Sequence, residues 1–200
     1  QALFVSGLLH EKLGGPSVKP PQPKGLWNAV GYTDSNTANF TADTGHEAVH
    51  RRTLYTFIKR TSPPPQMSTF DGPSRESCVV RRERSNSPMQ ALLLMNDPQY
   101  VECARSLAER TLRDAGSADD QRAAYLLRHC LLRIPTQQEI QGLVEDAQTF
   151  LAEYTADPEA AKALIQVGEM PPDESLNPTE LAAWTMVSNL VLNLDEFLNK

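Results

Sequence analysis

The chain has 200 residues and a formal net charge of −6, and 40% of its residues are hydrophobic. This length is enough to bury a core, and we predict a single domain over residues 1–200. The overall charge is not that of a nucleic-acid-binding protein, and no apolar run approaches the length of a membrane span. We therefore expect no nucleic-acid partner and no membrane-spanning helix.

The first residues of the chain read QALFVSGLLHEKLGG, with no Met and no charged leader, so no signal peptide is visible. They are typical of the last turns of a helix that ends at Gly14 or Gly15. Because this helix has no start signal, we expect the chain to be a fragment from the C-terminal end of a longer protein.

Residues 1–88 are predicted to be irregular, because nine of the 15 prolines and seven of the 10 glycines lie there. Residues 53–59 are rich in β-branched and aromatic side chains and read as a short strand. Residues 78–81 are the expected partner strand. We predict a basic, proline-rich half with at most one small β-hairpin.

Residues 89–200 are predicted to be helical, which makes the fold mainly α. Apolar side chains recur there at helical spacing, and several helices have a capping residue or an Asx-Pro start. We expect about five helices. The start signals are Asp97-Pro98, Ser117 with Asp120, the capping box Thr136-x-x-Glu139, Asp157-Pro158 and Asn177-Pro178.

The charges are divided unevenly along the chain. Residues 51–100 contain eight Lys or Arg against four Asp or Glu, whereas residues 151–200 contain two against nine. The basic block can pair with the acidic helices or with a charged partner, or the two can be separately solvated faces.

The three cysteines, Cys78, Cys103 and Cys130, contain no C-x-x-C pair. One disulfide with one free thiol is an alternative, but the apolar helix faces around Cys103 and Cys130 favour buried thiols.

Residues 46–50 read HEAVH, which matches the H-E-x-x-H pattern of zinc hydrolases. In those enzymes two histidines on one helix face hold the ion, and the glutamate deprotonates its water. The candidate metal ligands are His46, His50 and Glu76.

The neighbours of this motif argue against zinc. Gly45 precedes it in a turn-rich segment, whereas a metal-binding helix must be formed in advance. Arg51 and Arg52 follow it, and their positive charges oppose a bound cation. We therefore expect no metal and no cofactor in this chain, and two solvated histidines on a loop or helical turn.

A second candidate site lies further along the basic block. Asp71 and Glu76 form a carboxylate pair of the kind used in acid–base catalysis. Arg81, Arg82 and Arg84 have the chemistry to hold a phosphate, sulfate or carboxylate group. An FDGP turn explains Asp71 without catalysis, and the arginines can instead pair with the acidic helices. The candidate catalytic residues are Asp71, Arg75, Glu76, Arg81 and Arg82.

Residues 51–110 read RRTLYTFIKRTSPPPQMSTFDGPSRESCVVRRERSNSPMQALLLMNDPQYVECARSLAER. Together with GGPSVKPPQP, LWNAVGY, SNTANF and the closing TELAAWTMVSNLVLNLDEFL, this stretch resembles a domain of unknown function. That domain ends large planctomycete and verrucomicrobial proteins with a "planctomycete cytochrome C" or "planctomycete surface" domain. In this family an aromatic residue usually precedes the double arginine, where the present chain has His50.

The resemblance implies an exported, extracytoplasmic protein whose other domains often include a haem c module. We predict an accessory domain that docks onto those domains, a protein partner or a polysaccharide, with no reaction of its own. One alternative is an enzyme acting on carbohydrate or sulfated glycan through the candidate catalytic residues. A second is a zinc hydrolase acting through the HEAVH segment.

Overall fold

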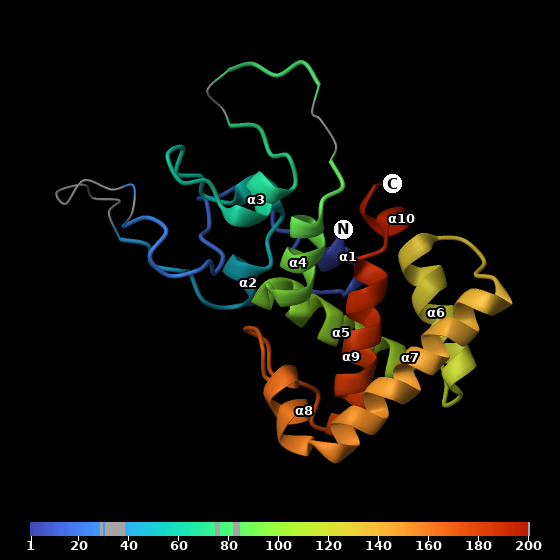
Figure 1. The fold of residues 1–200 in the computed structure, drawn as a ribbon. Coiled ribbons are helices and arrows are strands. Elements are labelled where there is room, and N and C mark those ends of the chain that lie inside the picture. Colours follow the sequence, from blue (N-terminus) through green and yellow to red (C-terminus); the bar gives the residue numbers. More distant parts are fainter. Residues whose placement is uncertain (29, 31–38, 75–76, 82–84, 200) are drawn as a thin grey trace. The chain divides into compact units, whose positions relative to one another are not determined.

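A computed structural model describes residues 1–28, 30, 39–74, 77–81 and 85–199, and this part of the chain is mainly helical with no sheet (Figure 1). It divides into two compact units. The helical unit comprises residues 1–9 and 94–200, and the loop unit comprises residues 10–93. Helix α4 (Pro88–Asn96) crosses the boundary between them. The mainly α fold with an irregular N-terminal half is as the sequence predicts.

The helical unit is built around helix α9 (Pro178–Leu192), which packs against α5, α7 and α8. Its sequence is apolar on nearly every side, which is typical of a helix surrounded by others. The remaining helices of the unit are α1 (Ala2–Val5), α5 (Pro98–Asp114), α6 (Asp119–Leu131), α7 (Gln137–Ala156), α8 (Pro158–Ile165) and α10 (Asp195–Leu198).

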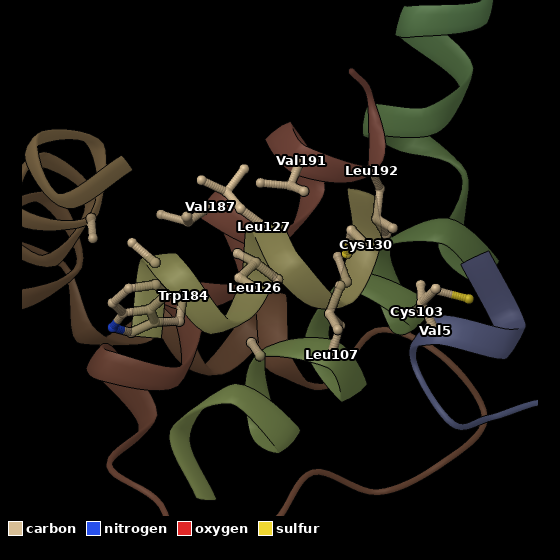
Figure 2. Close-up of a cluster of buried hydrophobic side chains, with 14 of the residues drawn as sticks. Val5, Cys103, Leu107, Leu126, Leu127, Cys130, Trp184, Val187, Val191 and Leu192 are labelled. Atoms are coloured by element: carbon tan, nitrogen blue, oxygen red, sulfur yellow. The ribbon is translucent and has the colours of Figure 1, made fainter. Parts of the chain in front are cut away.

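The core of the helical unit is formed by buried side chains from α1 and from each helix between α5 and α10. Figure 2 shows the part of it contributed by α1, α5, α6 and α9. Leu107, Leu126 and Val187 have no exposed surface, and Trp184 is almost fully buried. Burying a large apolar side chain stabilises the fold by roughly 1.5–3 kcal/mol. This core therefore holds together helices that are far apart in the sequence.

The helix starts follow the predicted capping signals at four of the five positions. Asp97, Asp157 and Asn177 each accept a hydrogen bond from the first turn of the helix that they precede, and Thr136 with Glu139 forms a complete capping box. The exception is α6, which begins at Asp119 after Ala118 with no side-chain cap. Acidic side chains in its first turn interact favourably with the helix dipole instead.

The described part of the loop unit contains only short helices, α2 (His46–Val49), the 3₁₀ turn η1 (Thr53–Tyr55) and α3 (Pro65–Thr69), before α4. The predicted pairing of residues 53–59 with 78–81 is wrong. Thr56 instead forms an isolated parallel bridge with Val18, and residues 53–55 are a 3₁₀ turn. The partner segment around Val18 lies between Pro16 and Pro20, and the residue before a proline favours an extended backbone.

No helix among the described residues is long and apolar enough to cross a membrane.

Candidate functional site

The structure places only part of the predicted catalytic cluster. Arg75, Glu76 and Arg82 lie outside the described residues. Arg81 is exposed, and Asp71 lies in the turn after α3 with a left-handed φ of 56°. Asp is one of the residues that tolerate this conformation.

Asp71 fastens the two ends of a long loop to each other. Its carboxylate accepts hydrogen bonds from the backbone N–H of Ser85, at 2.7 Å, and from the Ser85 hydroxyl, at 2.8 Å. Gln90, on α4, donates from its side chain to the same hydroxyl and to the Thr69 carbonyl. These bonds, first from the Ser85 backbone and then from its hydroxyl, lower the pKa of Asp71. An ionised Asp71 therefore serves as an acceptor within the fold.

Arg51 has several partners within the described part of the loop unit. It is 6% exposed, and its guanidinium donates to the carbonyl oxygens of Lys12 (3.0 Å), Gly14 (2.6 Å) and Pro16 (3.0 Å). The guanidinium also lies 3.8 Å from the centre of the Tyr55 ring. In turn, the Tyr55 hydroxyl oxygen accepts a hydrogen bond from the N–H of Gly14. The planar guanidinium group has five N–H donors. It thus supplies hydrogen bonds to backbone carbonyl oxygens of a proline- and glycine-rich loop that is not part of a β-sheet.

Three histidines gather beside Arg51. Nδ1 of His46 and Nδ1 of His50 are 2.9 Å apart, and the ring centres of His10 and His46 are 5.6 Å apart. The backbone N–H of His10 donates to the His50 carbonyl at 2.9 Å. His50 is fully buried. The predicted solvated histidine pair is therefore wrong for His50, because the segment at residue 10 covers the helical turn.

Glu47, the residue that would act on water in a zinc hydrolase, has an exposed side chain. It lies 3.7 Å from the ammonium group of Lys12. Among the described residues, no three His, Cys, Asp or Glu side chains are already arranged as a metal site.

An aromatic cluster with two lysines lies elsewhere in the loop unit. Trp27, which is 3% exposed, contacts Phe40 and Phe57 with ring centres 5.1 and 5.7 Å apart. The ammonium groups of Lys19 and Lys59 lie 6.0 and 5.0 Å from the Trp27 ring centre. The rings thus hold two positive charges close to one point by cation–π attraction.

The helical unit contains a buried ionic cluster on one face of α5. Arg105, 1% exposed, lies between Glu102 at 3.8 Å and Glu109 at 3.9 Å. Its guanidinium donates to the carbonyl oxygens of Ile165 and Met170. Burial raises the pKa of Glu109. Through these hydrogen bonds, the cluster anchors the segment that joins α8 to α9.

The acidic C-terminal residues pair with arginines of the same helical unit. Glu180 lies 2.7 Å from Arg122, and Glu196 lies 2.8 Å from Arg133. At least two carboxylates of this region thus have an arginine partner within the helical unit.

A family model described as "PSD1: Protein of unknown function (DUF1553)" matches residues 1–146. The chain belongs to the PSD1 family. The match covers the whole loop unit and the helical unit as far as α7. No curated protein and no solved structure matches the chain. The family has no assigned reaction, which agrees with the resemblance read from the sequence.

The sequence reasoning missed three groups that organise the PSD1 chain. The sequence predicts only that the charge of Arg51 opposes a bound cation, and it predicts no role for His10 or Arg105. A charged residue at a core position of an otherwise apolar helix stripe signals Arg105. No local pattern signals His10, because its partners are 36 and 40 residues away.

Proposed function

We propose that this PSD1 chain is a recognition and docking domain of an exported multidomain protein. Its ligand would be an anionic polysaccharide, and it would hold that ligand without breaking bonds. The extracytoplasmic location and the accompanying domains are part of the proposal.

The observation that carries the proposal is that two polar side chains of the basic block, those of Arg51 and Asp71, bond to other groups of the loop unit. Both terminal nitrogens of Arg51 donate to backbone carbonyls, its guanidinium lies over the Tyr55 ring, and the Asp71 carboxylate accepts hydrogen bonds from Ser85. A catalytic carboxylate or arginine must instead face the reacting atoms. In this proposal, both residues stabilise the fold of the loop unit and take no part in a reaction.

The two lysines at Trp27 are the recognition groups in this proposal. Trp27 is too deeply buried to stack on a sugar ring, so the cluster does not favour a neutral polysaccharide. Lys19 and Lys59, both half-buried, place two ammonium groups over one aromatic cluster. Sulfate or carboxylate groups of a sugar chain would be attracted to these two positive charges.

Titration calorimetry of the full chain against a sulfated polysaccharide and its unsulfated parent tests this function. We expect binding to the sulfated form only, and at least tenfold weaker binding by the double variant Lys19→Gln/Lys59→Gln. The control, Lys24→Gln/Lys162→Gln, makes the same charge change at exposed positions. Equal weakening in both variants, or no binding by the parent chain, would contradict the proposal.

The same mixtures also test the enzyme alternative. If reducing ends or free sulfate accumulate, and Asp71→Asn abolishes their release, the chain is a hydrolase. The docking proposal expects no release of either product by the parent chain.

A further inference from the structure

We propose that residues 77–81 bind a partner protein by adding one strand to the open edge of its β-sheet. The segment reads Ser-Cys-Val-Val-Arg. It is separate from the lysines at Trp27, so the proposal does not depend on polysaccharide binding.

The apolar side chains of this segment face solvent. Val80 is fully exposed and Val79 is 52% exposed, and Cys78 and Arg81 are exposed as well. Adjacent β-branched residues favour a strand, in which they pack against side chains of the neighbouring strand. The segment therefore has the side chains of a strand without the packing of one.

The backbone of the segment is also unpaired. In the described part of the chain, no hydrogen bond joins residues 77–81 to another residue, and these residues form neither helix nor strand. Extending them therefore breaks no internal hydrogen bond. A run of unpaired N–H and C=O groups is a template for pairing with another strand.

Hydrogen bonds on either side of the segment fix where it leaves and rejoins the loop unit. Ser85 donates from its N–H and its hydroxyl to the Asp71 carboxylate. The Gln90 side chain donates to the same hydroxyl and to the Thr69 carbonyl. Because the ends are joined, the segment has fewer conformations to lose when it binds.

The kind of partner follows from what the segment lacks. The described part of this chain contains no sheet, so a second copy offers no sheet edge in that part either. In an extended segment Val79 and Val80 point to opposite faces, and Arg81 points to the face of Val79. The partner that fits is a sheet whose edge strand presents apolar side chains to the valines and a carboxylate to Arg81.

A backbone-cyclised β-hairpin peptide, with valine and glutamate alternating on its free edge strand, is the probe for such a sheet. It is titrated into the full chain under reducing conditions, and amide hydrogen exchange is followed by NMR. We expect slower exchange within residues 77–81. The same hairpin with N-methyl groups on its free edge should bind at least fivefold more weakly, because these groups remove the backbone donors. No protection of the segment, or equal binding of both hairpins, would overturn the proposal.

Proline substitutions separate backbone pairing from side-chain contact. The N–H groups of Val79 and Val80 point to opposite edges of an extended segment, and only one edge joins the sheet. Val79→Pro and Val80→Pro should therefore differ at least fivefold in affinity for the hairpin. Neither should change the Tm of the chain, since both residues are exposed. Equal weakening by the two would show that the ladder does not form.

The charge of Arg81 is tested by a matched pair of variants. Arg81→Gln should weaken hairpin binding at least threefold, whereas Arg60→Gln makes the same charge change at another exposed position and should leave it unchanged. Equal effects of the two would remove the carboxylate from the proposed partner and overturn it. Protection of residues 77–81 that rises with chain concentration, without the hairpin, would instead assign the segment to a second copy.

Discussion

Arg51 organises a segment that has very few regular backbone hydrogen bonds. In the loop at residues 12–16, three backbone carbonyl oxygens accept hydrogen bonds from the single guanidinium group of Arg51. Neither lysine nor a neutral side chain reproduces that planar set of donors together with stacking on Tyr55. The conformation of a glycine- and proline-rich loop thus depends on one residue far along the sequence.

Replacing Arg51 by lysine is expected to lower the free energy of unfolding of the loop unit by about 2 kcal/mol, because hydrogen bonds to a charged donor are lost. Arg52→Lys is the neighbouring control. Arg52 is exposed, so its change should stay within about 0.5 kcal/mol. Urea unfolding, followed by Trp27 fluorescence in a Trp184→Phe background, measures both. Similar effects of the two changes would show that the carbonyl contacts are unimportant.

Asp71 makes a pH-dependent contribution to stability. Its pKa is lowered in the folded chain, chiefly by the backbone N–H of Ser85, so the ionised form contributes stability above the pKa of the unfolded chain. That contribution is lost as the pH falls through the folded pKa. The Tm difference between the parent chain and Asp71→Asn should therefore be present at about pH 7 and shrink below about pH 4. Asp146→Asn, an exposed change on α7, is the control, and a difference independent of pH would contradict the expectation.

At the scale of elements, α5 anchors a connection that has little regular structure of its own. Glu102 accepts hydrogen bonds from the N–H groups of Glu169 and Met170, and Glu109 accepts one from that of Asp173. Arg105 lies between the two carboxylates and completes the cluster. One face of a helix therefore fixes the path of the chain between α8 and α9.

Arg105→Met should destabilise the helical unit by about 3–5 kcal/mol, because it leaves buried carboxylates without their cation. Arg110→Met removes a cation from the same helix, but Arg110 is 40% exposed and its ion pair with Asp114, at 3.6 Å, lies at the surface. That change should cost less than about 1 kcal/mol. Amide hydrogen exchange locates the effect. Faster exchange at residues 169–173 is expected in Arg105→Met alone, and unchanged exchange there would contradict the anchoring role.

Across the whole molecule, local sequence signals predict the helices better than they predict the side-chain clusters. Asp157 and Asn177 cap α8 and α9 because capping needs only residues adjacent in the chain. The predicted pairing of residues 53–59 with residues 78–81 is wrong. The observed bridge depends on how a loop distant in the sequence is placed, and local sequence patterns do not show this. The candidate catalytic cluster stays a prediction, because part of it lies outside the described residues. Arg105 is buried by tertiary packing against residues far away in the sequence, so a short stretch of sequence cannot predict its partners.

The cysteines report on the core as a whole. Cys103 and Cys130 are buried, and burial raises the pKa of each thiol to about 12, whereas Cys78 is exposed. Because the thiolate is the reactive form, a thiol reagent at about pH 8 should label one cysteine in the folded chain and three in urea. Mass spectrometry should place the fast label on Cys78, and a Cys78→Ser chain should remain unlabelled until it unfolds. Rapid labelling of Cys103 under native conditions would mean that α1, α5 and their neighbours do not form the closed core seen here, since this thiol lies within it (Figure 2).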